Sequence, residues 1–504
     1  MWQAKLNIEY TIHCGKTNSG KTYQSIQRLK EIGQGVYLAP LRLLAWEIFD
    51  KLNENDFVCN LVTGEEQITS PHAKMTASTI EMLNSNQFHE CVVIDEAFML
   101  SDKDRGKAWL NAILNVKAKE VHIITNPEAL DLIKGILECC DRTFTVKNYE
   151  MLQPFKFAEF SFEMRGKGKL QPQGVFVSFS RKGVLYNKRK FENMGNTVSI
   201  LYGNLPPEVK KQQIADFISG KSDVLVTTDV IGMGINVPCN YLVFLEVEKF
   251  DGTQVRRLNS IEVKQISGRC GRYGLNDGSP TVNAMDKGSL RYIKEQYGLN
   301  TVIKKAYFGL DFNIFNSLPA ETSVRDRINY FKETDFIPDN IKHLVYKESV
   351  KKYFEIAEVV DKKQFDVKEK WDFLTAPVKY NNMQYFSSAI YGYTQTKLLR
   401  KPDLLKITQS DAKTIEDNIS EIELYLNLTR HFIFNIGDKK LCQNHKEKLI
   451  DRLSEVIADK KLIGKKKCKT CDTMLSVDSH YNYCNPCFRK NFSYDDDYSF
   501  FRHS

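Results

Sequence analysis

Short apolar segments alternate with amphipathic, helix-like segments through the first 150 residues of the chain. The apolar runs predict strands over residues 6–13, 36–40, 91–94 and 121–125, and a helix-like segment follows them, as at 22–29. Strands and helices in this alternation build a parallel sheet with helices on both faces. The pattern therefore predicts an α/β domain over residues 1–150.

A second alternating series begins after a basic, glycine-containing linker at 165–173. Its apolar runs predict strands over 174–179, 197–202, 223–228 and 241–247, and hence a second parallel-sheet domain over 151–310. Beyond residue 310 the strand signals fade, so residues 311–460 are predicted to be helical. A stripe at helical spacing within 411–432 is interpreted as helix core rather than a partner surface, and it comprises Ile415, Ile419, Ile422, Leu424 and Leu426.

Composition adds little about the partner of the protein. At 504 residues and 42% hydrophobic content, the chain is long enough for several cores. Its formal charge of +8 permits a polyanionic partner without demanding one. The sequence holds no apolar run long enough for a transmembrane helix, and the first motif, at residue 15, is expected to leave no room for a cleaved presequence. We therefore expect a soluble protein without a membrane partner, located in the cytoplasm, or in the host cytoplasm for a viral source.

The twelve cysteines fall into two groups. Eight are scattered among apolar residues and are expected to be reduced core residues. The other four form two C-x-x-C pairs, a spacing at which four thiolates bind Zn²⁺, and they are Cys468, Cys471, Cys484 and Cys487. Disulfides and a ligand role for His480 are the alternatives. We expect a small zinc-knuckle module at 461–492, with lysines and aromatic residues suited to nucleic acid or protein docking, and a loose tail at 493–504.

Residues 15–22 read G-K-T-N-S-G-K-T, which fits the phosphate-binding template G-x-x-x-x-G-K-[ST]. The glycines let backbone amides approach phosphate oxygens, Lys21 reaches the β and γ phosphates, and the Thr22 hydroxyl suits Mg²⁺. A glycine-rich turn is the alternative. The predicted ATP-binding loop comprises Gly15, Lys16, Thr17, Asn18, Ser19, Gly20, Lys21 and Thr22.

Asp95 and Glu96 follow the apolar run at 91–94. The carboxyl ends of parallel strands form the ligand-binding edge of such sheets. Asp95 is therefore predicted to orient Mg²⁺, and Glu96 to accept a proton from the water that attacks the γ-phosphate. An ordinary pair of carboxylates at a strand end is the alternative, but it leaves the upstream phosphate loop unexplained.

The second domain contains T-T-D at 227–229, G-M-G-I-N at 232–236 and Q-I-S-G-R-C-G-R at 265–272. Arg269 and Arg272 lie three residues apart, so on a helix both would project from one face toward a phosphate held by the first domain. We interpret them as arginine fingers, with a solvated basic face as the alternative. With these motifs the chain resembles superfamily 2 DExH-type helicases, and most of all the mitochondrial degradosome RNA helicases and their bacterial and viral relatives, over residues 10–380.

This resemblance implies two RecA-like domains with ATP bound between them. It also implies that Gln265 contacts the nucleotide or the attacking water, that Gly232 and Gly234 let a loop bend at the cleft, and that Asp229 fixes this loop. The segments at 40–45, 63–66 and 79–82 match strand-contacting motifs of the family. Ordinary turns and helix caps are the alternatives for Thr63, Gly64 and Thr79. The implied nucleic-acid contacts are Arg42, Thr63, Gly64, Thr79, Ser180 and Thr228.

Residues 243–249 and 255–261 flank Asp251-Gly252, a hairpin signal, and related enzymes place a strand-separating hairpin here. A plain edge hairpin remains the alternative. Two positions depart from the family. Phe98 replaces a polar residue and cannot hydrogen-bond toward Gln265, and the segment T-N-P at 125–127 matches the third motif only loosely.

Together these features predict an ATP- and Mg²⁺-dependent helicase that moves 3′ to 5′, with RNA as the expected strand, DNA left open and a nuclease as a candidate partner. A zinc-containing nucleoside kinase and a nucleic-acid adaptor with a vestigial ATPase are the alternatives. The kinase needs no second α/β domain that ends in residues 265–272, and detectable ATP turnover would exclude the adaptor.

Overall fold

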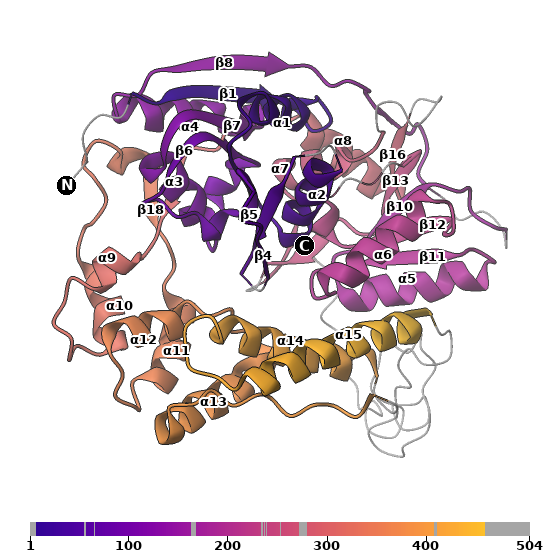
Figure 1. Ribbon diagram of the computed structural model, residues 1–504. Helices are drawn as coiled ribbons and strands as arrows, with labels where there is room; N and C mark the ends of the chain where they lie inside the picture. The colour runs from indigo at the N-terminus through magenta and orange to yellow at the C-terminus, as the bar shows by residue number, and fades with distance from the viewer. Residues whose placement is uncertain are drawn as a thin grey trace, which may run out of the picture.

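The structure is a computed structural model, and it describes residues 7–54, 57–64, 66–162, 168–232, 235, 237, 239–251, 254–271, 280–407 and 411–458. Within these residues, two parallel sheets lie side by side and a helical region runs along the lower side of both (Figure 1). This confirms an α/β protein with two RecA-like parallel-sheet domains and a helical C-terminal region. The predicted zinc ligands Cys468, Cys471, Cys484 and Cys487 lie outside the described residues.

The first sheet has the order β4-β3-β5-β2-β6-β7-β1-β8, and only the β3–β4 pair is antiparallel in the described residues. Its inner strands read as continuous apolar runs because helices cover both faces. The strands are β1 Glu9–Gly15, β2 Gly35–Ala39, β3 Cys59–Val62, β4 Gln67–Ile68, β5 Met75–Thr79, β6 Phe88–Ile94, β7 Lys117–Thr125 and β8 Phe144–Tyr149. The helices are α1 Lys21–Ile32, α2 Arg42–Asn53, α3 Gly106–Asn115 and α4 Pro127–Cys139, with short 3-10 turns at η1 Ile80–Met82 and η2 Ala97–Ser101.

The second sheet has the order β11-β12-β10-β13-β16-β9, and its described strands are all parallel. The strands are β9 Lys156–Phe157, β10 Gly174–Val177, β11 Val198–Leu201, β12 Val224–Thr227, β13 Tyr241–Phe244 and β16 Thr281–Ala284. The helices are α5 Arg181–Asn193, α6 Pro207–Ile218, α7 Ser260–Ser267 and α8 Lys287–Gly298, with a 3-10 turn η3 Asp229–Gly232. The predicted hairpin is present as the antiparallel pair β14 Glu248–Phe250 and β15 Val255–Arg257.

The C-terminal region is helical except for one short parallel pair, β17 Ala306–Phe308 and β18 Val345–Lys347. This pair packs on the core of the first domain through Ile303, Ala306, Ile341 and Val345. The remaining helices share a core with the second domain. They are α9 Phe312–Phe315, α10 Val324–Glu333, α11 Lys351–Val360, α12 Val367–Leu374, α13 Met383–Thr396, α14 Ala412–Leu428 and α15 Ile436–Ala458, with 3-10 turns η4 Lys342–Leu344 and η5 Tyr380–Asn382.

The predicted core residues are buried where the structure describes them. All five apolar residues of the stripe on α14 have exposures of 8% or less, which confirms that stripe as helix core. The eight scattered cysteines are free thiols, as expected. Among the described residues, we find no helix that combines the length and apolar character needed to cross a bilayer.

Candidate nucleotide cleft and strand channel

The phosphate loop connects β1 to α1 at the carboxyl edge of the first sheet. Gly15 lies against β8, where a β-carbon would come within 2.6 Å of the carbonyl oxygen of Tyr149, so a larger residue does not fit. Gly20 caps α1 with a φ of 80°, in the left-handed region that glycine adopts without strain. The N-terminus of α1 therefore points into the phosphate loop, and its free backbone N–H groups favour an anion there.

Lys21 lies over this loop. Its Nζ donates hydrogen bonds to the carbonyl oxygens of Gly15, at 2.6 Å, and Lys16, at 2.7 Å. Burial lowers the pKa of Lys21, and the charges of Glu96 and Asp95 act in the opposite direction. The ammonium group is thus held between the loop and two carboxylates, which is where a phosphate-binding lysine is required.

Asp95 is a buried carboxylate at the end of β6, with 5% of its surface exposed. The hydroxyl of Tyr37 donates to Oδ2, and the backbone N–H of Glu96 donates to Oδ1 at 2.8 Å. The indole of Trp109 fixes the backbone by donating to the Asp95 carbonyl at 2.8 Å. Burial, and next the charge of Glu96, raise the pKa of Asp95 to about 7 despite these hydrogen bonds.

These groups fit a divalent cation. The raised pKa of Asp95 shows that the site disfavours its negative charge, and a cation beside the carboxylate would reverse this effect. Glu96 follows with a φ of 47°, a left-handed conformation that costs a non-glycine residue free energy and that clusters at functional sites. Oxygen donors of the carboxylate and hydroxyl type, as on Asp95 and Thr22, are those that Mg²⁺ prefers.

Arg269 brings the second domain to this site. Its Nη2 donates to Glu96 Oε1 at 3.1 Å and to the carbonyl of Gly232 at 2.9 Å. Among the described residues, the buried Nε of Arg269 has no hydrogen-bond partner, which suits a ligand such as a phosphate oxygen. The expected shared helix face is wrong, because α7 ends at Ser267 and Arg269 lies beyond it. Arg272 and Gly234 lie outside the described residues.

The segment around Arg269 also packs on the phosphate loop. A β-carbon on Gly268 would come within 2.7 Å of Cβ of Thr17, and Asn18 donates to the carbonyl of Gly271 at 2.5 Å. Gln265 lies behind this contact, 3.7 Å from the β-carbon position of Gly232. The two sheets therefore meet at one cleft, as a nucleotide-driven motor requires and a single-domain nucleoside kinase does not. The predicted residues assembled here are Gly15, Lys16, Thr17, Asn18, Ser19, Gly20, Lys21, Asp95, Glu96, Gly232, Gln265 and Arg269.

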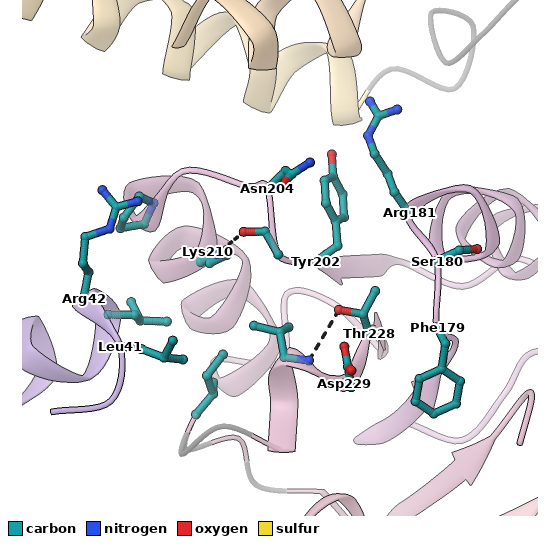
Figure 2. A pocket seen from close by; sticks show the side chains of 15 residues that line it. Leu41, Arg42, Phe179, Ser180, Arg181, Tyr202, Asn204, Lys210, Thr228 and Asp229 are labelled. Carbon is teal, nitrogen blue, oxygen red and sulfur yellow. Dashed lines mark hydrogen bonds between the residues drawn. The ribbon is translucent and has the colours of Figure 1, made fainter. Parts of the chain in front are cut away.

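A second site lies at the junction of both α/β domains with the helical region, where residues line a cavity of about 410 Å³ (Figure 2). Three predicted strand-contacting residues, Arg42, Ser180 and Thr228, are in its wall. Sequence reasoning missed Arg181, Tyr202 and Lys210, which also line it. Burial, and next the charge of Arg42, lower the pKa of Lys210 to about 8. We call this cavity the strand channel.

The hydroxyls of the channel also serve the local backbone. Ser180 caps α5 by accepting from the N–H of Gly183 at 2.9 Å, and Thr228 accepts from the N–H of Val230 at 3.4 Å. Thr79 ends β5 beside Ala39, with 6% of its surface exposed. Ser180 therefore caps a helix and also stands in the channel wall, since capping uses only one lone pair of its hydroxyl, whereas Thr79, for which a helix cap was the alternative, makes no capping hydrogen bond with its side chain among the described residues.

The polar face of α14 contacts side chains of the channel wall. Glu416 pairs with Arg181 at 3.1 Å and accepts from the hydroxyl of Tyr202 at 2.5 Å, and both partners point toward the helical region in Figure 2. Glu423 lies 3.8 Å from Arg42 and 3.3 Å from Lys446. The interpretation of this helix as core alone missed these contacts, because acidic residues on an amphipathic helix usually face solvent.

Thr63 and Gly64 are held by the same helix. Asn427 donates to the carbonyl of Gly64 at 2.6 Å, and Arg430 donates to the carbonyl of Thr63 at 2.8 Å. The Thr63 hydroxyl accepts from the N–H of Glu66 at 3.0 Å, so the turn alternative describes its local geometry. These two residues lie under α14 and are not in the wall of the cavity.

The two departures from the family motifs have structural roles. Phe98 belongs to the core of the first domain, with 6% exposure. Asn126 caps α4 by accepting from the N–H of Ala129 at 3.2 Å, and Pro127 follows at the first helical position. The residues of the third motif therefore form the start of helix α4 in this chain.

Comparison with known proteins agrees with this geometry. Residues 3–149 match the model of the DEXQ-box helicase domain of Suv3, and residues 167–274 match the helicase conserved C-terminal domain. The mitochondrial ATP-dependent RNA helicase SUV3 of Saccharomyces cerevisiae is 40% identical over 275 residues, which are 53% of this chain and 37% of that protein. The chain thus spans little more than a third of the yeast protein's length.

A second relative matches over more of the chain, and a solved structure matches as well. The mitochondrial DExH-box ATP-dependent RNA helicase DExH16 of Arabidopsis thaliana is 30% identical over 453 residues, 86% of this chain and 78% of that protein. Among solved structures, S. cerevisiae Dbp5 bound to RNA and ADP BeF3 matches with a TM-score of 0.44 and 16% identity, over 58% of this chain and 84% of that one.

These relatives correct one expectation. The predicted cytoplasmic location was wrong, because the matched relatives from yeast, Arabidopsis and rice are mitochondrial proteins. Composition and the position of the first motif do not determine the compartment, so the error arose from using them for that purpose. The two family models and the long match to DExH16 cover the motifs that assemble the cleft. The chain therefore belongs to the Suv3-type DExH-box helicases of superfamily 2.

Proposed function

We propose that this chain is an ATP-dependent RNA helicase that moves 3′ to 5′ along one strand by closing its two α/β domains around ATP. The observation that carries the proposal is the contact between Arg269 and Glu96, at 3.1 Å, because it joins the second domain to the carboxylate beside the phosphate loop. Closure at this contact places charge from both domains on one triphosphate.

The roles of the cleft residues follow from their positions. Lys21 binds the β and γ phosphates, and Glu96 accepts a proton from the attacking water. Arg269, with Arg272 as the second predicted finger, stabilises the negative charge that develops on the transferred phosphoryl group. Asp95 and Thr22 would hold Mg²⁺, which neutralises phosphate charge when bound. The carbonyl of Gly232 supports Arg269 from the second domain, and Gln265 is proposed to contact the nucleotide or the attacking water, as the family resemblance implies.

The strand channel is proposed to hold RNA through its backbone. Arg42, Arg181 and Lys210 supply positive charge, while Ser180 and Thr228 supply hydroxyls. Such groups bind phosphates and sugars without reading bases. The names of the relatives support RNA over DNA as the strand. A nuclease partner remains a prediction from the family resemblance.

The decisive experiment measures ATP hydrolysis with RNA, with DNA and without nucleic acid, together with unwinding of duplexes that carry a 3′ or a 5′ tail. We expect turnover stimulated by RNA and unwinding of the 3′-tailed duplex only. Lys21→Ala should abolish both activities and retain RNA binding. ATP turnover that nucleic acid leaves unchanged would contradict the proposal, as would preferred unwinding from a 5′ tail.

We also propose a zinc module over residues 461–492, supported by the spacing of Cys468, Cys471, Cys484 and Cys487 alone. Its test is the metal content of the purified full chain. We expect one equivalent of zinc per chain, as a single four-thiolate site binds, and its loss in the variant Cys484→Ser/Cys487→Ser. The same zinc content in that variant would contradict the assignment.

A further inference from the structure

The hairpin β14–β15 presents two different faces. Lys249 and Arg256 are paired across the ladder and lie on its half-buried face. Phe250 and Val255 are also paired, and they expose 62% and 66% of their surface on the other face. An isolated two-stranded ribbon is marginally stable in water. The position of this ribbon therefore depends on what holds its inner face.

Lys249 holds the ribbon to two different segments of the second domain. Its Nζ lies 2.6 Å from Asp229 Oδ2 and 3.0 Å from Glu262 Oε1, and 18% of its side chain is exposed. Glu262 also accepts two hydrogen bonds from Arg256, each at 2.9 Å. Burial alone would raise the pKa of Glu262, but the hydrogen bond from Arg256 and the charge of Lys249 bring this pKa below its ordinary value.

Both partners of Lys249 begin segments that lead to Arg269. Asp229 begins η3, which ends at Gly232, and the carbonyl of Gly232 accepts from Arg269 at 2.9 Å. Glu262 completes the capping box of α7 with Asn259, and α7 leads through Gln265 to Gly268 and Arg269. Asp229 is also part of the wall of the strand channel (Figure 2).

We infer that Lys249 is a positioning residue that couples events at Arg269 to the movement of the hairpin. The inference rests on the proposed function. When ATP binding or hydrolysis displaces Arg269, the starts of η3 and α7 shift relative to each other, and Lys249, bonded to both, moves the ribbon with them. The exposed pair Phe250 and Val255 is then driven against the base pair at the duplex junction, where an apolar surface replaces base stacking.

The test compares Lys249→Met with two matched variants of the full chain. Lys249→Arg keeps the positive charge and should restore coupling. Lys221→Met is the control at an exposed ion pair of the same domain outside the ribbon, where Lys221 is 3.1 Å from Asp216 and 72% exposed. For each variant we measure RNA affinity, the kcat and KM of RNA-stimulated ATP hydrolysis, and the number of base pairs separated per ATP on a 3′-tailed RNA duplex.

We expect Lys249→Met to retain RNA affinity and kcat while base pairs separated per ATP fall about tenfold, a size usual for contacting residues that act together. Lys249→Arg and Lys221→Met should match the wild type. Unchanged separation per ATP in Lys249→Met would overturn the inference, and so would a parallel loss of turnover and unwinding, which indicates a structural role only.

A second variant and the turnover of the wild type separate a failure of this inference from a failure of the proposed function. If Lys249→Met does not fold, Glu262→Gln tests the same link, because Lys249 then keeps its ion pair with Asp229 and glutamine can still complete the capping box of α7, and the same loss of separation per ATP is expected at unchanged RNA affinity. Normal separation per ATP in Glu262→Gln would overturn the inference. A wild-type chain without RNA-stimulated turnover would refute the proposed function, and with it this inference, before any variant is compared.

Discussion

The chemistry of the cleft depends on a few charged side chains that the fold buries, although charged groups are more stable in water. Asp95 is the clearest case, since it lies beside Glu96 and is nearly inaccessible to water. The folded protein holds the Asp95 proton up to a pH of about 7, whereas an ordinary aspartate releases it near 3.8. Between these values the folded state binds more protons than the unfolded state, so the free energy of unfolding falls as the pH rises.

Asp95→Asn should therefore stabilise the metal-free protein at high pH. The amide carries no charge to bury, so we expect the free energy of unfolding to exceed that of the wild type by an amount on the order of 4 kcal/mol at pH 8, since the pKa of Asp95 rises from 3.8 to about 7 and each tenfold change in proton affinity corresponds to about 1.4 kcal/mol. The difference in the free energy of unfolding between Asp95→Asn and the wild type should be smaller at pH 5. Denaturant unfolding in EDTA, followed by tryptophan fluorescence, measures it, because Trp109 contacts Asp95 directly. An equal gap at both pH values would contradict the prediction.

Arg269→Ala tests the side chain that reaches from the second domain to Glu96. The change removes the guanidinium from Glu96 without altering the strand channel, so kcat for RNA-stimulated hydrolysis should fall by about 10³-fold, as for arginine fingers, while RNA affinity is retained. Fluorescence anisotropy of labelled RNA measures the affinity. Arg291→Ala is the control, since Arg291 is 82% exposed on α8. Wild-type turnover in Arg269→Ala would remove Arg269 from the catalytic role. The same loss of turnover at retained affinity is expected for Arg272→Ala.

Among the elements, the strands that form continuous apolar runs were the ones that the sequence predicted well. The runs at 36–40 and 91–94 became β2 and β6, because strands buried on both faces are continuously apolar. The edge strand β8 was missed, since exposed polar residues such as Lys147 and Asn148 interrupt its apolar pattern. Tyr37 carried an unused signal, because a phenol within an aliphatic buried strand requires a polar partner, here Asp95.

The helix α14 shows why the channel was only partly predictable. Its apolar stripe was recognised, but its acidic face meets residues from both α/β domains that are more than 200 positions away in the sequence, as in the pair Arg181–Glu416. Periodicity identifies a buried face and carries no information on what the opposite face meets. Contacts that join three separate regions of a chain are therefore available only from the folded structure.

Glu423→Gln tests the charge balance of this helix. The carboxylate is 7% exposed, and the positive charges of Lys446, Arg42 and Lys379 bring its pKa below the ordinary value even though burial acts in the opposite direction. Without it these cations are less compensated, so RNA should bind more tightly and the salt dependence should steepen by about 0.7 in log–log slope, as for one more phosphate neutralised on a single strand. Anisotropy titrations at several salt concentrations measure both quantities.

The control for this change is Glu421→Gln on the same helix, where Glu421 accepts from Asn418 at 3.2 Å. That variant should leave RNA affinity and its salt dependence as in the wild type. Weaker RNA binding in Glu423→Gln with an unchanged slope would indicate that Glu423 serves only to orient Arg42.

Across the molecule, the two sheets are joined by the helical region on one side and by a small set of ion pairs at the cleft. Lys211 of α6 pairs with Asp50 of α2 at 2.5 Å, and Lys264 of α7 pairs with Glu128 of α4 at 2.9 Å. The second pair is the more buried, with side-chain exposures of 20% and 11%. Removing or reversing one partner of a partly buried pair leaves an uncompensated charge, which costs more than the loss of an exposed pair.

The pair Glu128–Lys264 should set how readily the domains close around ATP. Glu128→Lys places like charges across the cleft, so the closed arrangement is disfavoured and KM for ATP should rise about tenfold, which corresponds to about 1.4 kcal/mol. The chemical step within a closed complex keeps all its groups, so kcat should change little.

Restoring the pair in reverse, as Glu128→Lys/Lys264→Glu, should return KM toward the wild-type value. Steady-state ATPase assays at saturating RNA measure all three chains. If the double variant is no better than the single one, the pair does not govern closure, and α4 is held by other contacts, such as the hydrogen bond from Ile303 N–H, in the segment after α8, to the Glu128 carbonyl at 2.7 Å.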